Sequence, residues 1–172
     1  STLRRMRRRY TPAMFLKWAR RWREIRPDGG LTTDIIVGFP GETDTEFEAS
    51  LEVARAAKFS AVHVFPYSPR AGTAAAVLPG LVAPAVQNRR VAALLQLGNE
   101  LSREYSAQFI GRTLPVLIET ISGDGSTAEG LIPHYVRACV AMPPESYVAA
   151  GDICRMQVHA WRDGTLEGVW QR

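Results

Sequence analysis

Apolar and polar residues alternate with two different periods along the chain of 172 residues. Apolar residues at helical spacing predict amphipathic helices that begin at Pro12, near Thr43 and at Pro84. Two apolar runs between these helices, 31–37 and 59–67, predict strands. From Gly111 onward the period becomes two, and turns rich in Gly and Pro separate roughly five short strands. The first part is therefore predicted to alternate helices with strands, and the last part to be all-β.

The order of these elements predicts the fold class. Strands and helices that alternate through short turns are typical of βα units in a parallel sheet. The run 31–37 has no period-2 alternation, which predicts a strand covered on both faces. Roughly five strands in about sixty residues predict a small closed barrel of the oligonucleotide-binding kind. We therefore predict an α/β protein with βα units over 1–83, a connecting helix over 84–110 and a small β-barrel over 111–172.

A glycine-rich turn follows the first predicted strand. Gly38 and Gly41 lack a Cβ, so the backbone can turn sharply there and approach a ligand. Glu42 lies inside this turn, and we expect it to hold the loop by accepting backbone hydrogen bonds. Thr43 and Glu46 fit a capping box, which predicts a helix start. Because ligands bind at the carboxyl edge of parallel strands, this turn is the candidate site.

Several aromatic side chains have alternative interpretations. Tyr67 ends the second predicted strand, at the same edge as Gly38, and is a candidate ligand contact. His63, inside that strand, is predicted to be hydrogen-bonded within a layer between sheet and helix rather than to carry protons. Trp18 and Trp22 share the apolar face of the first long helix, and we expect them in the core.

Charge and composition narrow the class of protein. The formal net charge of +4 is uneven, because residues 1–26 hold nine Arg and one Lys against a single Glu. Such a basic end predicts a polyanionic partner, or else a solvated helix face. No apolar run reaches the ~18 residues of a membrane span, and no signal peptide pattern is present, so we expect a cytoplasmic protein without a membrane partner. Cys139 and Cys154 are predicted to be buried free thiols.

The all-β segment carries residues that RNA-binding surfaces use. Arg112 and Arg137 supply positive charge, and Tyr135 supplies an aromatic face on which a base can stack. Other candidates of the same kind are His134, Arg155, His159 and Arg162. An ordinary small barrel with scattered surface Arg explains this segment equally well when it is considered alone.

Three segments together resemble the radical-SAM methylthiotransferase family. They read RMRRRYT at 5–11, TDIIVGFPGET at 33–43 and HVFPYSPRAGTAA at 63–75. The long helix and terminal barrel look like the connector and TRAM domain of that family, so the resemblance covers essentially the whole chain. The third segment is similar to the branch that acts on N6-threonylcarbamoyladenosine at position 37 of tRNA. The branches for isopentenyladenosine in tRNA or for a ribosomal protein aspartate remain alternatives, as does a noncatalytic RNA-binding module.

The resemblance implies a cofactor and the residues that would contact it. In this family S-adenosylmethionine binds an iron–sulfur cluster and yields a radical that removes hydrogen from C2 of adenine, after which a methylthio group is inserted. The residues that match the adenine-side surface are Val37, Gly38, Phe39 and Tyr67. Asp34 is a candidate for polar groups of the cofactor or substrate. The fold implied for 1–83 is the last part of a partial radical-SAM barrel.

The resemblance also implies the partners. The expected partners are tRNA, through its anticodon stem-loop, and an electron donor for the cluster, and the protein is expected to be a monomer. Residues expected to contact substrate or RNA are Arg5, Arg8, Arg9, Arg112, Tyr135 and Arg137.

The family's cluster-binding cysteines are absent from this sequence. That family uses a C-x-x-x-C-x-x-C loop for one 4Fe–4S cluster and cysteines of a preceding domain for a second. Cys139 and Cys154 have the wrong spacing, so no metal ligand and no catalytic residue is expected in this chain. The chain thus resembles the carboxyl-terminal part of such an enzyme and is expected to be inactive alone.

Overall fold

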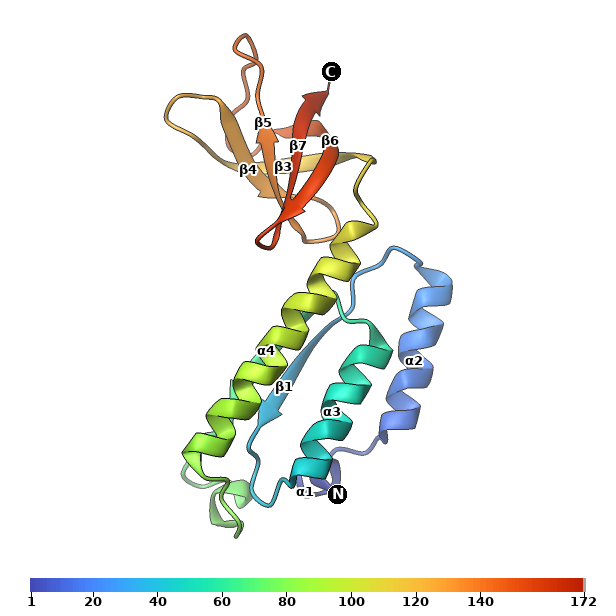
Figure 1. The fold of residues 1–172 in the computed structure, drawn as a ribbon, viewed down its shortest axis with the longest axis vertical. Coiled ribbons are helices and arrows are strands. Elements are labelled where there is room, and N and C mark those ends of the chain that lie inside the picture. The colour runs from blue at the N-terminus through green and yellow to red at the C-terminus, as the bar shows by residue number, and fades with distance from the viewer. Residues whose placement is uncertain (172) are drawn as a thin grey trace. The chain divides into compact units, whose positions relative to one another are not determined.

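The computed structural model describes residues 1–171 and contains two compact units (Figure 1). The first unit comprises Ser1–Leu101, and the second begins at Ser102. The long helix α4, Pro84–Ala107, contributes residues to both units. Each unit has its own cluster of buried apolar side chains. The boundaries expected for three segments remain a prediction.

The remaining elements of the first unit are α1 (Thr2–Arg5), α2 (Pro12–Ile25), β1 (Thr32–Val37), α3 (Asp44–Ala57), β2 (Ala61–Pro66) and a 3-10 helix (Ala74–Val77). In this unit, α2 and α3 begin at the residues that the sequence signals predict, whereas α1 was not predicted. Thr11 caps α2 by accepting from the Met14 amide at 3.2 Å. The capping box of α3 is confirmed, because Thr43 Oγ1 accepts from the Glu46 amide and the Glu46 carboxylate accepts from the Thr43 amide, both at 3.2 Å.

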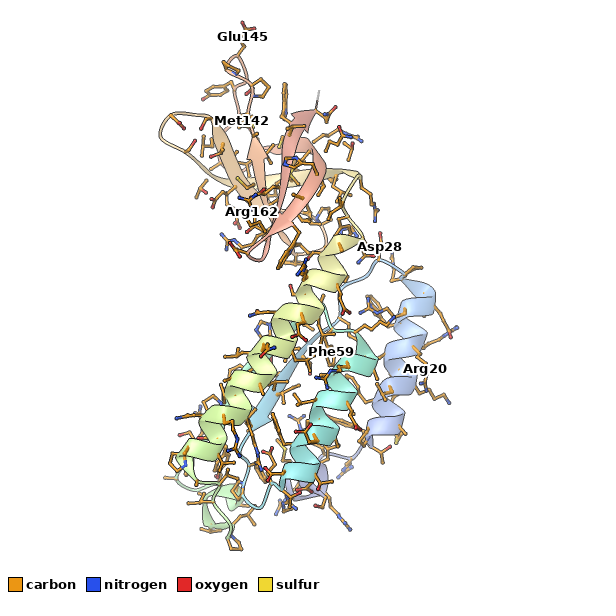
Figure 2. The ribbon with its side chains drawn as sticks, viewed as in Figure 1. Arg20, Asp28, Phe59, Met142, Glu145 and Arg162 are labelled. Carbon is orange, nitrogen blue, oxygen red and sulfur yellow. The ribbon has the colours of Figure 1, made fainter. Side chains whose placement is uncertain are left out.

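β1 and β2 pair in parallel, and helices cover one face of this sheet. Thr32 pairs with Ala61 at one end, and Val37 pairs with Pro66 at the other. The covered face packs into a cluster that includes Phe59, 2% exposed, at the end of α3 (Figure 2). Other members of this cluster are Ala19, Val37, Phe47, Leu51, Ala54, Ala57, Leu94, Leu97 and Leu101.

The prediction that β1 is covered on both faces is wrong. Burial alternates along the strand, and Ile36 is 38% exposed. Its neighbour in register, Phe65 on β2, is 49% exposed. The prediction failed because both faces of the strand carry apolar residues, so the sequence lacks the apolar–polar alternation that marks a strand with one uncovered face. Two parallel strands are described here, so the larger radical-SAM barrel remains an expectation.

Two further predictions for this unit are wrong. Trp18 is 55% exposed and Trp22 is 38% exposed, whereas Ala19 is the buried residue of α2. The small Ala19 is the α2 residue that enters the buried cluster of this unit, whereas both tryptophan side chains keep a large exposed area. His63 pairs in register with Asp34 and is exposed on the uncovered face of the sheet rather than held in a layer between sheet and helix.

The second unit is a closed five-stranded barrel, which confirms the small barrel predicted from Gly111 onward. Its strands run in the order β3-β4-β5-β7-β6, with β5 and β7 parallel and the other pairs antiparallel. Their bounds are Thr113–Ile121 for β3, Thr127–Leu131 for β4, Arg137–Ala141 for β5, Ile153–Arg162 for β6 and Thr165–Gln171 for β7.

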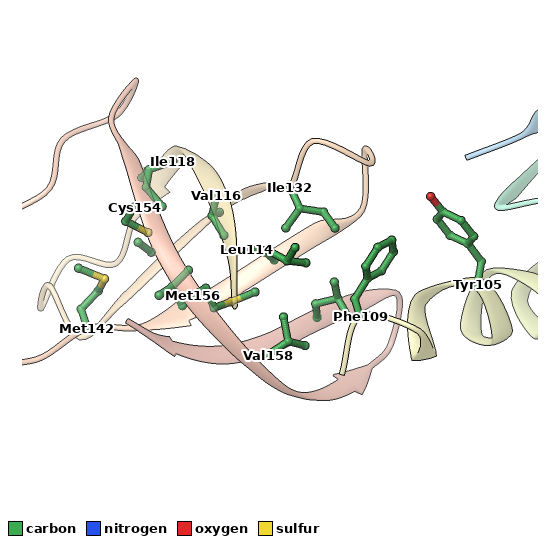
Figure 3. Close-up of a cluster of buried hydrophobic side chains, with 14 residues drawn as sticks. Tyr105, Phe109, Leu114, Val116, Ile118, Ile132, Met142, Cys154, Met156 and Val158 are labelled. Atoms are coloured by element: carbon green, nitrogen blue, oxygen red, sulfur yellow. The ribbon is translucent and has the colours of Figure 1, made fainter. Parts of the chain in front are cut away.

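Alternate residues of the barrel strands fill its interior (Figure 3). Val116 and Met156 are fully buried, and Phe109 enters the same cluster from the segment that follows α4. Both cysteines are free thiols, as predicted, but only Cys154 is buried in this core, whereas Cys139 is half-buried. Burial raises the pKa of both thiols, so neither is activated as a thiolate.

A carboxylate organises the turn between β3 and β4. Asp124 Oδ1 accepts hydrogen bonds from Ser122 Oγ at 2.6 Å and from the Ser126 amide and hydroxyl at 3.0 and 2.8 Å. These bonds favour the ionised carboxylate and lower the pKa of Asp124 to about 2.

We expect the Asp124 carboxyl to titrate near its lowered pKa of about 2 in an NMR titration. Because the pKa is lowered in the folded state, the stabilisation is present above the ordinary Asp pKa and is lost as pH falls through the lowered value. Ser126→Ala should move the midpoint upward, whereas Ser146→Ala, in another loop of the barrel, should leave it unchanged. A midpoint at the ordinary Asp value in the wild-type chain would contradict the hydrogen bonds.

Candidate functional site

β1 and β2 end side by side, as the sequence predicts for Gly38 and Tyr67. The Tyr67 amide donates to the Val37 carbonyl at 2.8 Å, which extends the strand pairing past Pro66. The Phe39 and Tyr67 rings meet edge to face with centroids 5.3 Å apart. The Tyr67 hydroxyl donates to the Ala75 carbonyl at 2.9 Å and so fixes its ring. These residues form one edge, which we call the strand-tip edge (Val37–Phe39 and Tyr67).

The turn after β1 is held from inside by Glu42, as predicted. Its Oε2 accepts from the Gly38 amide at 2.5 Å and from the Phe39 amide at 3.1 Å. Gly38 and Gly41 have φ values of +78° and +75°, in the region that favours glycine. The Gly41 amide donates to the Gly80 carbonyl at 2.7 Å. The turn is therefore a fixed structure whose amides already have protein partners.

Arg90 neutralises the buried Glu42 carboxylate, and sequence reasoning did not find it. The side chains of Arg90 and Glu42 are both 5% exposed, and Arg90 Nη1 lies 3.5 Å from Glu42 Oε1. Arg90 Nη2 lies 2.7 Å from Asp44 Oδ1. Burial raises the pKa of Glu42, although the Gly38 amide and the Arg90 charge act in the opposite direction. The hydrogen bond and charge of Arg90 lower the pKa of Asp44. Arg89 and Arg90 are adjacent and look alike in the sequence, so no local signal distinguishes the buried one.

Gln87 of α4 bridges the two strand tips and was also missed. Its Nε2 donates to the Val37 carbonyl at 3.1 Å and to the Tyr67 carbonyl at 3.0 Å. A Cβ built on Gly38 would lie 2.7 Å from the same Nε2. The missing Cβ of Gly38 was expected to let the backbone approach a ligand, whereas the space beside Gly38 is occupied by the Gln87 side chain.

An open groove of about 1140 Å³ is lined by residues of β1 and the end of β2 together with residues of α1, α3 and the segment that leads into α2. Asp34, Phe39 and Tyr67 line it, and these are three of the five residues predicted to contact a cofactor. Val37 and Gly38 do not line it: the Val37 side chain is 1% exposed, and its carbonyl accepts from both Tyr67 and Gln87. The cofactor contacts expected at Val37 and Gly38, like those at Asp34, Phe39 and Tyr67, remain a prediction.

The basic N-terminal segment contributes to the same groove. Arg8 and Arg9, both predicted to contact substrate or RNA, line it and are exposed. Arg4 and Arg70 also line the groove, and they were not predicted. Four guanidinium groups against the carboxylates of Asp34 and Glu46 make the lining electropositive.

Arg5 has a different position from the one predicted. Its guanidinium donates to the Pro40 carbonyl at 3.2 Å, to the Gly41 carbonyl at 3.0 Å and to the Glu46 carboxylate at 3.0 Å. These contacts use the donors of Arg5 to tie α1 to the glycine turn. The structure therefore gives Arg5 a bracing position, and its expected contact with substrate or RNA remains a prediction.

The three RNA-contact candidates of the barrel belong to the second unit. Arg137 begins β5, is exposed and pairs in register with Leu131 and Thr165. Tyr135 is 87% exposed in the loop before β5 and has a φ of +58°. The Arg112 guanidinium lies 5.4 Å from the centroid of the Phe109 ring. Their role in RNA binding remains a prediction.

Within residues 1–171, no group of three or more His, Cys, Asp or Glu side chains is placed to hold a metal ion. No helix in that range is long and apolar enough to cross a membrane.

Comparison with known proteins found relatives that match nearly the whole chain. No family model matches it. Proteins from Mycobacterium sp. (strain MCS), Parafrankia sp. (strain EAN1pec) and Nocardioides sp. are 40%, 43% and 38% identical over 95%, 95% and 97% of the chain. The chain covers only 35–36% of their length, so it spans about a third of each. All three are named tRNA-2-methylthio-N(6)-dimethylallyladenosine synthase.

These relatives support the resemblance to the radical-SAM methylthiotransferase family. Their name favours the dimethylallyladenosine, or isopentenyladenosine, branch, which was an alternative in the sequence interpretation, over the threonylcarbamoyladenosine branch. Among solved structures, an exoribonuclease from Candida glabrata aligns with 55% of this chain at 18% identity and a TM-score of 0.38, which is too low to support an argument.

Proposed function

We propose that this chain forms part of a radical-SAM tRNA methylthiotransferase that adds a methylthio group to C2 of N6-dimethylallyladenosine in tRNA. The observation that carries the proposal is the identity of about 40% to synthases of that name across 95% of the chain. The electropositive groove and the closed barrel support it, because both are surfaces suited to nucleotides.

The groove is the place where an adenosyl group would bind. Its lining offers the Phe39 and Tyr67 rings at the strand tips and the exposed Ile36 and Phe65 side chains beside them. Its volume of about 1140 Å³ exceeds the range of ~300–1,000 Å³ typical of small-molecule sites, so there is room for a cofactor and a substrate base. When bound, S-adenosylmethionine and an iron–sulfur cluster would supply the radical chemistry.

The residues of this chain would orient the bound groups and exclude water rather than take part in bond breaking. The Tyr67 ring is fixed through its hydroxyl to Ala75, so it would present a rigid face to an adenine ring. The Asp34 carboxylate would accept hydrogen bonds from a ribose or amino group, and Arg8 and Arg9 would attract phosphates. Apolar side chains on the floor of the groove would keep water away from the reacting base.

The test of this proposal uses the full-length protein that carries this chain, reconstituted with iron and sulfide. We expect methylthio incorporation into tRNA that carries dimethylallyladenosine, detected by mass spectrometry of the digested nucleosides. Incorporation only into tRNA with threonylcarbamoyladenosine, or only into a ribosomal protein, would replace the proposed substrate. Binding of tRNA without any transfer under these conditions would favour a noncatalytic RNA-binding module.

The barrel would contribute electrostatic affinity for tRNA. Replacing Arg112 and Arg137 together with Ala is expected to weaken tRNA binding and to reduce the slope of log Kd against log salt by about 1 for each phosphate that is no longer neutralised. Fluorescence anisotropy over a salt series measures both effects. Arg55→Ala is the control, since Arg55 is an exposed residue of α3 in the first unit and lies outside the basic segment 1–26. An unchanged slope would remove both residues from the RNA contact surface.

A further inference from the structure

We propose that Gln87 is a positioning residue that sets the spacing of the two strand tips and thereby the affinity of the groove for an adenosyl group. The proposal rests on the proposed function, because it concerns the same strand-tip edge. Gln87 does not line the groove, whereas Phe39 and Tyr67 do. It would therefore act on a ligand only through the residues that it holds.

The carboxamide of Gln87 links the two strands where their regular pairing ends. The last bond between the strands runs from the Tyr67 amide to the Val37 carbonyl at 2.8 Å. Beyond it, Gln87 Nε2 donates to the carbonyls of Val37 and Tyr67 at 3.1 and 3.0 Å. An amide nitrogen has two hydrogens, so one group can serve both strands at once. A change in the separation of the tips would break at least one of these bonds.

Gly38 leaves the space that the bridge requires. A Cβ on Gly38 would lie 2.7 Å from Gln87 Nε2 and 2.9 Å from its Cγ. Both distances are shorter than a real Cβ contact, so any side chain at position 38 would displace the carboxamide. Gly38 and Gln87 therefore form one structural pair, in which the absence of a Cβ leaves room for the bridge and also allows the φ of +78° at Gly38.

The bridge is anchored by its neighbour one helical turn later. Arg90 lies three residues after Gln87 on α4 and is bound to Glu42 and Asp44. Glu42 in turn holds the amides of Gly38 and Phe39. The same turn of helix thus fixes the β1 tip through Arg90 and joins it to the β2 tip through Gln87.

The first measurement is amide hydrogen exchange on the chain of 172 residues. Gln87→Met keeps the length of the side chain but removes both donors. We expect exchange at the Tyr67 amide to accelerate at least tenfold, while the Val64 amide within β2 changes less than twofold. Gln87→Glu, whose ionised carboxylate would face two carbonyl oxygens, should have a larger effect at the same amide. The matched control is Gln96→Met, because Gln96 is an exposed residue of α4 that binds Glu100 at 3.0 Å.

The second measurement is the affinity of the full-length protein for S-adenosylhomocysteine, determined by calorimetry. We expect Kd to rise about tenfold in Gln87→Met and to stay at the wild-type value in Gln96→Met. Gly38→Ala should raise the Kd for S-adenosylhomocysteine in the wild-type background. The same substitution should raise it less in Gln87→Ala, because the side chain with which the new Cβ collides is then absent.

The outcomes separate this proposal from the proposed function. Unchanged exchange at Tyr67 in both Gln87 variants would overturn the bridge. Faster exchange with unchanged affinity for S-adenosylhomocysteine would overturn the positioning role and leave Gln87 with a purely structural one. A wild-type protein that binds no S-adenosylhomocysteine would contradict the proposed function, whereas the exchange experiment would still test the bridge.

Discussion

Replacing Gly130 with Ala is expected to unfold the β-barrel. A Cβ at Gly130 would lie 1.9 Å from the Leu117 carbonyl oxygen and 2.8 Å from its carbon. These are backbone atoms of the neighbouring strand β3, so no side-chain rotation can relieve the collision, and the pairing of β3 with β4 must open. We expect a loss of about 4 kcal/mol or more in the free energy of unfolding, a large part of the ~5–15 kcal/mol that stabilises a typical domain.

NMR spectra of the barrel amides measure this effect directly. Signals such as that of Val140 should lose their dispersion in Gly130→Ala at a temperature where the wild-type chain is folded. Gly123→Ala is the matched control, because a Cβ on Gly123 meets no atom within 4 Å. A dispersed, native-like spectrum for Gly130→Ala would contradict the close approach of β3 and β4.

Replacing Arg90 with Met is expected to have the second-largest effect. The substitution leaves the Glu42 carboxylate buried without its countercharge, and breaking a buried pair from one side costs about 3–5 kcal/mol. Urea unfolding should show this loss, whereas Arg89→Met, at an exposed position next to it, should change stability by less than about 0.5 kcal/mol. The double variant Glu42→Gln with Arg90→Met should recover part of the loss, since the unpaired charge is then absent.

The pH dependence of the Arg90 effect has a definite sign. The pKa of Glu42 is raised in the folded state, so folding takes up a proton between the ordinary pKa of Glu and the raised value. Over that window the free energy of unfolding falls as pH rises. Removing Arg90 raises this pKa further and widens the window. Arg90→Met should therefore be more destabilising at pH 7 than at pH 4, and an equal loss at both values would contradict an ionised Glu42.

Local signals predicted much of the fold, because they depend on few residues. The Thr11 cap, the capping box of α3 and the period-2 strands of the barrel each follow from chemistry within one element. The exposure of Trp18 could not be predicted in this way, since it depends on which neighbour packs against α2. The exposure of Ile36 on β1 could not be predicted for the same reason, because it depends on whether another element covers that face of the sheet.

The candidate site was predicted in part for a similar reason. The bracing role of Glu42 was found because the glycine turn lies within ten residues of sequence, and the strand-tip edge was found because the carboxyl ends of parallel strands meet at the same edge of a sheet. Gln87 and Arg90 reach this turn from α4, and their contacts with Val37 and Glu42 span 50 and 48 residues. No pattern within α4 distinguishes these two side chains from exposed neighbours. Polar contacts of single side chains with residues far away in the sequence could therefore be found only in the three-dimensional structure.

The place of β7 in the barrel has a consequence for biosynthesis. This strand, the last in sequence, lies between β5 and β6, so the ring of strands cannot close before it is made. A ribosome must therefore release β7 from its exit tunnel before the barrel acquires its core, and the earlier barrel strands emerge with unpaired edges. β1 and β2 of the first unit are both translated before any strand of the barrel, so their pairing does not wait for β7.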